Sequence, residues 1–244
     1  MGLLRRGALL GAAAWVGYGW GPQCVLPLLA VRRGPAGRGQ VALTFDDGPD
    51  PEWTPRLLRL LAARDVRATF FLIGERAARH PDVVRAIVAD GHEVGNHTWR
   101  HRNAWFLGPA ATRRELVEGA RILADLTGGS PRLYRPPWGI VNLAALRVAR
   151  QAGFTVVLWS VQPEGLRPKA PAAQLAWCAR RLHDGAILDL HDAPGLPGAP
   201  ARLLDLMPPL LDLLAERGYG AVTVGSLLDG AACRGSGRMG RDFT

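Results

Sequence analysis

The sequence is poor in lysine and cysteine. Lys169 is the only lysine, so the formal net charge of +9 rests on arginine. Such arginine usage fits either the base composition of a genome or a surface for anionic lipids or wall polymers, and alone it identifies no partner. No basic run is interleaved with aromatic residues as a groove for single-stranded nucleic acid requires. We therefore expect no nucleic-acid partner.

The three cysteines, Cys24, Cys178 and Cys233, are too few and too widely spaced for a disulfide framework or a cysteine-based zinc site. Cys178 lies in an apolar helical pattern and is expected in the core. Internal repeats are also lacking. A chain of 244 residues with 48% hydrophobic content can bury one full core, and we expect one folded domain acting as a monomer.

Charge is missing from residues 7–31, which Arg5 and Arg6 precede and Arg32 and Arg33 follow. The stretch is long enough to span a bilayer, and it lacks a small-x-small cleavage site. This favours a signal-anchor, with a cleaved signal or a peripheral segment as alternatives. We therefore expect a protein held at the cell membrane with its folded part outside the cytoplasm, or a secreted one.

The rest of the chain alternates strand and helix patterns. Boundaries are expected as a membrane or signal segment (1–33), a linker (34–40), a folded domain (41–229) and a flexible tail (230–244). Strands are predicted at 41–45, 66–73, 93–97, 133–136, 155–161, 186–190 and 221–224. About seven parallel strands with helices between them predict an α/β fold, either a parallel barrel or a doubly wound sheet, and of these we expect a distorted (β/α) barrel.

Polar residues follow the predicted strands at the edge where such barrels carry their chemistry. Asp46 and Asp47 end the first strand in Thr-Phe-Asp-Asp-Gly-Pro (residues 44–49), a run that alone could merely cap a helix. His97 and His101 follow the third strand, four residues apart, as on a helical turn. Two imidazoles and a carboxylate suit a catalytic zinc site, although cobalt, nickel or manganese also accept such ligands.

Two further strand ends carry polar side chains. Arg135 opens Arg-Pro-Pro-Trp-Gly (residues 135–139), and His191 ends Leu-Asp-Leu-His (residues 188–191). An arginine can hold a carboxylate ionised, and a histidine can deliver a proton at neutral pH. Alone, each could also be an ion pair or a buried histidine.

Together these segments resemble carbohydrate esterase family 4, the polysaccharide deacetylases with a NodB-like homology domain. The resemblance covers about residues 40–228, and four motifs occur in order: residues 44–49, His97-Thr-x-x-His101, residues 135–139 and residues 188–191. It implies a metal-dependent hydrolase that removes N-acetyl or O-acetyl groups from a carbohydrate polymer containing N-acetylglucosamine.

The resemblance also implies a role for each residue. Asp47, His97 and His101 would bind one divalent metal ion, zinc by preference. Asp46 would be the general base, oriented by Arg135, and His191 the acid that protonates the leaving amine. The backbone N–H of Trp138, flanked by Pro137 and Gly139, would stabilise the oxyanion, and the Trp138 ring could stack on a sugar.

The family's fourth motif is altered. Gly165 and Leu166 stand where the family usually has Asp-Trp, so His191 is expected to lack its usual carboxylate partner unless Glu164 or Asp189 substitutes. A pH optimum shifted to lower values would follow. Two alternatives to a polymer deacetylase stay open, a deacylase of a lipid-linked sugar and a weakly active carbohydrate-binding relative.

Overall fold

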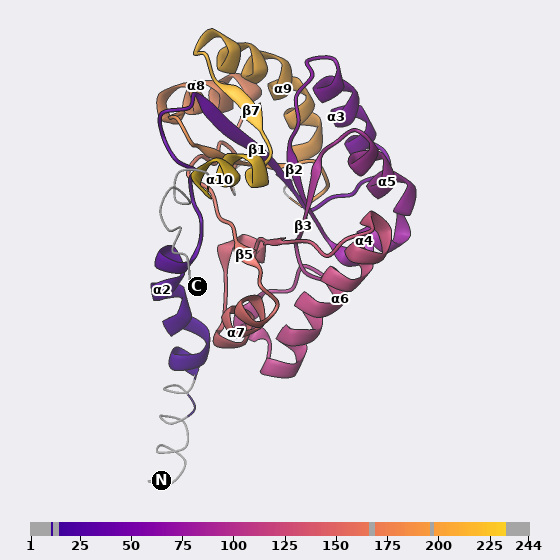
Figure 1. Ribbon diagram of the computed structural model, residues 1–244, viewed down its shortest axis with the longest axis vertical. Helices are drawn as coiled ribbons and strands as arrows, with labels where there is room; N and C mark the ends of the chain where they lie inside the picture. The colour runs from indigo at the N-terminus through magenta and orange to yellow at the C-terminus, as the bar shows by residue number, and fades with distance from the viewer. Residues whose placement is uncertain (1–10, 12–14, 166–168, 196–197, 233–244) are drawn as a thin grey trace, which may run out of the picture.

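The computed structural model describes residues 11, 15–165, 169–195 and 198–232. In this part of the chain seven parallel strands form one sheet in the order β5-β4-β3-β2-β1-β6, with β7 paired to the start of β1 (Figure 1). The strands are β1 (Gln40–Asp46), β2 (Thr69–Leu72), β3 (Glu93–Asn96), β4 (Leu133–Tyr134), β5 (Thr155–Val156), β6 (Ile187–His191) and β7 (Gly220–Val222). The predicted α/β class with parallel strands is confirmed.

The two edges of this sheet approach each other, so that the sheet curls into a distorted barrel. Val161 forms an isolated bridge with Leu188 of β6, and Val31 bridges Val157 beyond β5. Arg33 adds an antiparallel bridge to Ala186. The strand predicted over 155–161 is therefore regular only at its start, because the chain then leaves β4 to reach β6.

Helices surround the strands (Figure 1). The helices α8, α9, α3 and α5 follow one another around one side, and α4, α6 and α7 continue around the other. Their bounds are α3 (Trp53–Ala62), α4 (Gly74–Arg79), α5 (Pro81–Ala89), α6 (Pro109–Thr127), α7 (Leu143–Gln151), α8 (Pro171–Arg181) and α9 (Ala199–Glu216), with 3-10 turns η2 (Ala104–Phe106) and η3 (Pro137–Gly139).

Side chains alternate along β1 between the helical layer and the barrel interior. Leu43 and Phe45 pack in the large cluster beneath the helices, which also holds buried Cys178, as predicted. Ala42 belongs to a second cluster with Phe71 and Ile187. Because side chains on a strand alternate, Thr44 and Asp46 share the face of Ala42 and point inward. The alternation of side chains along β1 thus places the Asp46 carboxylate inside the barrel.

The helix α10 (Val224–Ala232) closes the end of the barrel where the strands begin. Val224 and Leu227 are fully buried in the interior cluster. The backbone N–H of Val224 donates to the Thr69 hydroxyl at 2.8 Å, and that of Gly225 donates to Glu93 at 3.0 Å. The other end, where the strands finish, stays open for a site. Residues 233–244 of the predicted tail lie outside the described residues.

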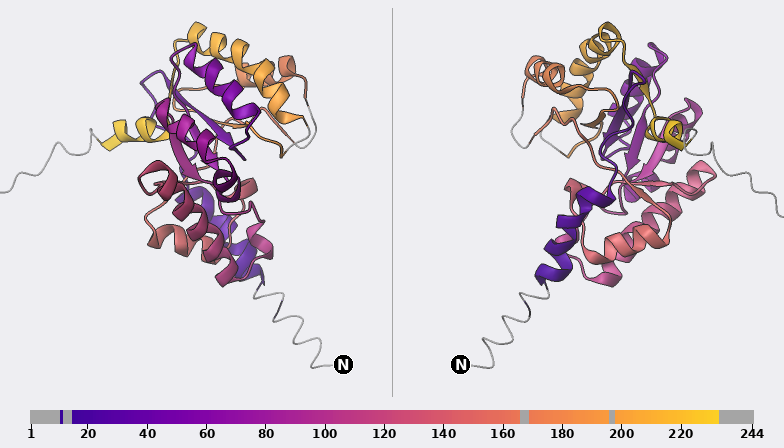
Figure 2. Two further views of the ribbon diagram at one scale, coloured as in Figure 1. Left: turned by 90° about the vertical axis from the view of Figure 1, so that its right-hand side faces the viewer. Right: turned by 60° about the vertical axis from the view of Figure 1, so that its left-hand side comes forward.

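The predicted membrane segment is not supported. Residues 1–10 and 12–14 lie outside the described residues. Every helix of the described residues is too short or too polar to cross a bilayer. The π-helical turn η1 (Val16–Trp20) and α2 (Gly21–Leu29) instead lie along α7 and η2 (Figure 2). Leu26 is buried there and joins one of the domain's own hydrophobic clusters, whereas Leu28 and Leu29 stay exposed.

Candidate active site

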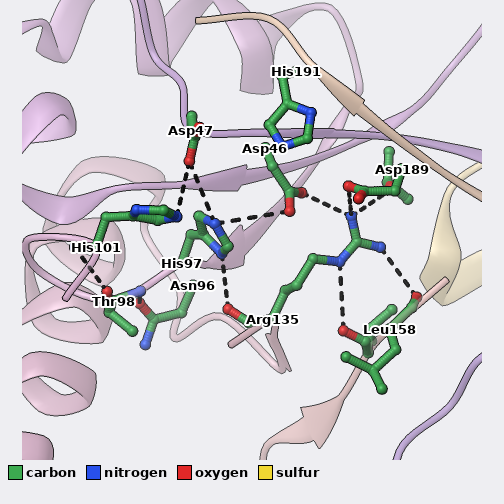
Figure 3. Close-up of polar contacts among 12 residues, drawn as sticks. Asp46, Asp47, Asn96, His97, Thr98, His101, Arg135, Leu158, Asp189 and His191 are labelled. Atoms are coloured by element: carbon green, nitrogen blue, oxygen red, sulfur yellow. Dashed lines mark hydrogen bonds and ion pairs between the residues drawn. The ribbon is translucent and has the colours of Figure 1, made fainter. Parts of the chain in front are cut away.

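Two adjacent aspartates end β1, and their carboxylates point in different directions (Figure 3). Asp46 is the last residue of the strand, whereas Asp47 has a left-handed backbone with φ 70°. The Asp46 carboxylate contacts Arg135, and the Asp47 carboxylate faces the two histidines. The change of backbone conformation therefore directs Asp46 to Arg135 and Asp47 to His101, while His97 Nε2 lies 3.7 Å from Asp46 Oδ2 and 3.5 Å from Asp47 Oδ1.

Asp47, His97 and His101 form a compact group of donor atoms. Oδ1 of Asp47 lies 3.1 Å from Nε2 of His101 and 3.5 Å from Nε2 of His97, and the three residues offer atoms within 4.8 Å of one another. Nδ1 of His97 lies 2.8 Å from the Arg135 carbonyl, a contact that directs Nε2 inward. This donor set suits a divalent cation.

The electrostatics of the group favour a positive charge at its centre. Burial would lower the pKa of His97, but the Asp46 and Asp47 carboxylates outweigh it and raise that pKa. Burial would raise the pKa of Asp47, yet its interactions with the His97 and His101 imidazoles hold it well below its usual range. Burial, with the His97 charge, lowers the pKa of His101 to about 4, which keeps that ring neutral and able to bind metal.

The two histidines do not lie on a helical turn, contrary to the expectation from their spacing. His97 follows β3 directly, and both Thr98 (φ 69°) and His101 (φ 55°) are left-handed. The Asn96 amide oxygen accepts from the Thr98 N–H at 3.0 Å, and the Thr98 hydroxyl accepts from the His101 N–H at 3.1 Å. These side-chain contacts bring the ring centroids to 4.8 Å.

The helix α6 packs closely behind this turn through Gly119. A Cβ at Gly119 would lie 2.5 Å from Asn96 Oδ1 and 2.8 Å from the Thr98 carbonyl carbon. The Asn96 amide also donates to the Leu116 carbonyl of α6 at 2.9 Å. The helix and the histidine turn thus form one rigid unit, which only a glycine at 119 permits.

Arg135 is fully buried inside the barrel. Its Nη1 donates to Asp46 Oδ1 and to the Thr44 hydroxyl, each at 2.7 Å, and lies 3.4 Å from Asp189 Oδ1 (Figure 3). The guanidinium carbon lies 4.1 Å from the Phe71 ring centre. Burial and the nearby Asp46 charge raise the pKa of Asp189 to about 7. Arg135 therefore fixes the Asp46 carboxylate in one orientation.

His191 does have a carboxylate partner. Its Nδ1 lies 2.5 Å from Oε2 of Glu164, whose side chain is only 2% exposed. Burial would lower the pKa of His191, but the Glu164 hydrogen bond and the Asp189 charge raise it to about 10. Of the two residues suggested as substitutes for the usual aspartate, Glu164 makes this contact, so the altered fourth motif does not leave His191 without a carboxylate partner.

One cavity of about 310 Å³ joins these groups. Trp138 lies at its rim, 55% exposed, with its ring centroid 4.3 Å from that of His101. Pro137 and Gly139, which flank Trp138 in η3, are buried. The predicted site residues that line the cavity are Asp46, Asp47, His97, His101, Trp138 and His191, joined by Ile73, Trp159, Gln162, Gly165, Asp189 and Gly195.

Several residues of the site escaped sequence reasoning. Gln162 donates to Asp189 Oδ2 at 2.9 Å, and the Thr44 hydroxyl accepts from Arg135. A Cβ at Gly195 would lie 2.1 Å from Oδ2 of Asp47, so this glycine passes directly over the carboxylate. Thr44 could have been predicted from the alternation of side chains along β1, because it lies on the same inward face as Asp46. No sequence signal places Gly195, because it lies in an irregular loop.

Comparison with known proteins assigns this arrangement to a family. The family model described as polysaccharide deacetylase matches residues 33–157. The chain belongs to the polysaccharide deacetylase family. A peptidoglycan N-acetylglucosamine deacetylase of Bacillus cereus is 34% identical over 80% of this chain and 70% of the relative. A chitooligosaccharide deacetylase of a Bradyrhizobium strain is 37% identical over 68% of this chain and 78% of the relative.

Solved structures agree with this membership. A peptidoglycan N-acetylglucosamine deacetylase superposes with a TM-score of 0.78 at 32% identity, covering 82% of this chain and 93% of that one. A family 4 carbohydrate esterase pseudoenzyme from Bacillus anthracis superposes with a TM-score of 0.74 at 27% identity, covering 82% and 69%. This polysaccharide deacetylase fold therefore also occurs without activity, and activity must be argued from the site residues.

Proposed function

We propose that this polysaccharide deacetylase is a metal-dependent hydrolase that removes N-acetyl groups from N-acetylglucosamine units of a cell-wall glycan. The observation that carries the proposal is the arrangement around one cavity. The Asp47, His97 and His101 donors lie beside the Asp46 carboxylate held by Arg135, and His191 with its Glu164 partner faces the same space. A base, an acid and a cation site are what amide hydrolysis needs.

Asp47, His97 and His101 are the proposed ligands of one divalent ion. The fit rests on two neutral-capable imidazoles, one carboxylate, and a buried Asp47 Oδ1 that finds no hydrogen-bond partner among the described residues. Zinc is the preferred ion for such a set, and cobalt, nickel and manganese are the alternatives. When bound, the ion supplies a Lewis acid that polarises the acetyl carbonyl.

Asp46 is the proposed general base. It takes a proton from the attacking water while the new C–O bond forms at the acetyl carbon. Arg135 keeps Asp46 in place through the 2.7 Å contact and balances its charge inside the barrel. The backbone N–H of Trp138, between Pro137 and Gly139, donates to the developing oxyanion.

His191 is the proposed acid. It gives its proton to the sugar nitrogen as the C–N bond breaks, which releases acetate and a free amine. Glu164 fixes the tautomer of His191 and favours the protonated ring, so that the ring keeps its proton at neutral pH. The altered fourth motif thus retains a carboxylate next to the acid.

Peptidoglycan is the first substrate to test, because the similar Bacillus cereus protein is named for it, and chito-oligosaccharides are the second. Catalysis on a wall polymer takes place outside the cytoplasmic membrane. The exposed Trp138 ring at the rim of the cavity offers a flat apolar surface on which a sugar ring could stack.

Acetate release from peptidoglycan, chitin oligomers and acetylxylan, measured with and without a chelator, tests the proposal. We expect release from the glycans that carry N-acetylglucosamine, loss of release with chelator, and recovery on adding zinc. No release from any substrate by metal-loaded protein, with glycan binding retained, would identify a carbohydrate-binding relative. Activity that requires a lipid carrier on the sugar would instead identify a deacylase of lipid-linked sugars.

A further inference from the structure

The helical segment before the barrel contacts two loops, of which the η3 turn contributes Trp138 to the cavity. Trp15 donates from its indole N–H to the Trp105 carbonyl at 3.3 Å, and the Tyr18 hydroxyl donates to the Leu107 carbonyl at 3.1 Å. Both contacts reach the loop around η2. Gln23, one turn further along, reaches a different loop, the η3 turn that holds Trp138.

The Gln23 side chain makes two hydrogen bonds to the backbone that follows Trp138. Its Nε2 donates to the Gly139 carbonyl at 2.7 Å, and its Oε1 accepts from the Val141 N–H at 3.1 Å. The primary amide therefore uses a donor and an acceptor at once, as a neighbouring peptide group would. Leu26, on the same helix, packs against Val141 in a buried cluster and anchors the helix at this place.

The turn that Gln23 contacts has a costly backbone conformation. Trp138 (φ 55°) and Gly139 (φ 67°) are left-handed in succession, and a residue with a Cβ loses free energy in that region. The N–H groups of Gly139 and Ile140 close the turn onto the two preceding proline carbonyls, each at 2.9 Å. Those bonds fix the start of the turn, while Gln23 fixes its exit.

We propose that Gln23 is a positioning residue for deacetylation. By fixing the exit of the turn, it keeps Trp138 left-handed, with its indole against His101 and the residue at the cavity. The inference rests on the function proposed above. It also gives the described part of the apolar N-terminal stretch a role in the active site, through the one amide side chain of α2.

The test compares two variants of the full chain that each remove one contact of the same helical segment. Gln23→Met keeps the side-chain length and loses both bonds to the turn, whereas Tyr18→Phe loses the bond to the η2 loop only. We expect Gln23→Met to lower kcat about tenfold or more with KM changed less than twofold, because misplacing an oxyanion donor acts on the transition state. Tyr18→Phe should keep kcat within twofold.

Hydrogen exchange supplies a readout that does not need activity. The amide of Val141 should exchange faster in Gln23→Met and at the wild-type rate in Tyr18→Phe. Gln23→Glu, which keeps an acceptor for Val141 but cannot donate to Gly139 when ionised, serves if Gln23→Met fails to fold. It too should lower kcat.

An inactive wild type would refute the proposed function and leave the exchange test standing. An unchanged kcat in folded Gln23 variants of an active enzyme, or an equal loss in Tyr18→Phe, would overturn the inference.

Discussion

Oε2 of Glu164 lies 2.5 Å from Nδ1 of His191, so the acid of the proposed reaction has a carboxylate partner one position before the one the family usually uses. The loop that carries Glu164 therefore supplies the same chemical group from a different backbone position. A pH optimum shifted to lower values is no longer expected, because the ring that would have lost its proton early is paired.

Removing this carboxylate should shift the pH dependence of the reaction. The pKa of His191 is raised to about 10, which keeps the acid protonated up to that pH, and the Glu164 hydrogen bond is the largest favourable cause. In Glu164→Gln we expect the alkaline limb of kcat/KM to move to lower pH by about one unit or more. A pH-rate profile on one acetylated substrate measures it.

A new carboxylate at position 165 should change the pH dependence of the reaction little. Among the described residues, no atom lies within 4 Å of a Cβ at Gly165, and the backbone there is not left-handed, so aspartate fits at this position. Because Glu164 already serves His191, we expect Gly165→Asp to leave the alkaline limb where it is in the wild type. A limb extended to higher pH in this variant would show that Glu164 serves His191 incompletely.

Arg135 should be essential for stability as well as for turnover. It is fully buried between Asp46 and Asp189, and Arg135→Met leaves both carboxylates without their cation. We expect a loss of about 3–5 kcal/mol in the free energy of unfolding, the range for breaking a buried ion pair. Urea denaturation checks it. Arg64→Met, which breaks an exposed pair with Asp212, is the control and should cost about 1 kcal/mol or less.

Substitution by alanine at two glycines that line the cavity should affect metal binding at one and not at the other. A Cβ at Gly195 would lie 2.1 Å from Asp47 Oδ2, whereas a Cβ at Gly165 meets open space. Gly195→Ala should therefore push the Asp47 carboxylate aside and weaken metal binding by about tenfold or more, as when a ligand's support is lost. Gly165→Ala should bind metal like the wild type. Titration of metal-free protein with zinc compares the two, and equal affinities would contradict the placement of Asp47 as a ligand.

Metal content should separate the roles of the adjacent aspartates. His97→Ala combined with His101→Ala removes two of three ligands and should abolish binding of about one ion per chain. Asp46→Asn should retain the ion and lose nearly all turnover, because an amide cannot take a proton from water. Elemental analysis beside acetate release tests both, and loss of the ion in Asp46→Asn would make Asp46 a ligand.

The affinity of the protein for the metal ion should fall toward acidic pH, since protons compete with the ion for His97.

The parallel fold and the residues gathered in the cavity were predictable because strand ends of a parallel barrel meet at one edge. Asp46, His97 and His191 each end or follow a strand, so pattern and topology together bring them close. The turn geometry was not predictable. Asp47 and His101 are left-handed. The Asp47 carbonyl accepts from Arg76, and the turn before His101 packs against Gly119, which are contacts between segments that no local spacing encodes.

Residues 15–31 of the apolar N-terminal stretch make contacts that hydropathy does not predict. Hydropathy does not distinguish a helix in lipid from one packed on its own domain, and only a few residues mark the packing here. Gln23 finds two backbone partners and Leu26 a buried cluster, both more than a hundred residues away in sequence. Only the folded barrel supplies those partners.

The seam formed by Val31 and Arg33 sets an order on folding during synthesis. These residues emerge from the ribosome early, yet their bridges are to Val157 and Ala186, which are made late. The barrel cannot be closed until the sixth strand exists, because contacts so distant in sequence must wait for their partners. The growing chain therefore has an open barrel edge for most of its synthesis, and this edge closes only after Ala186 has been made.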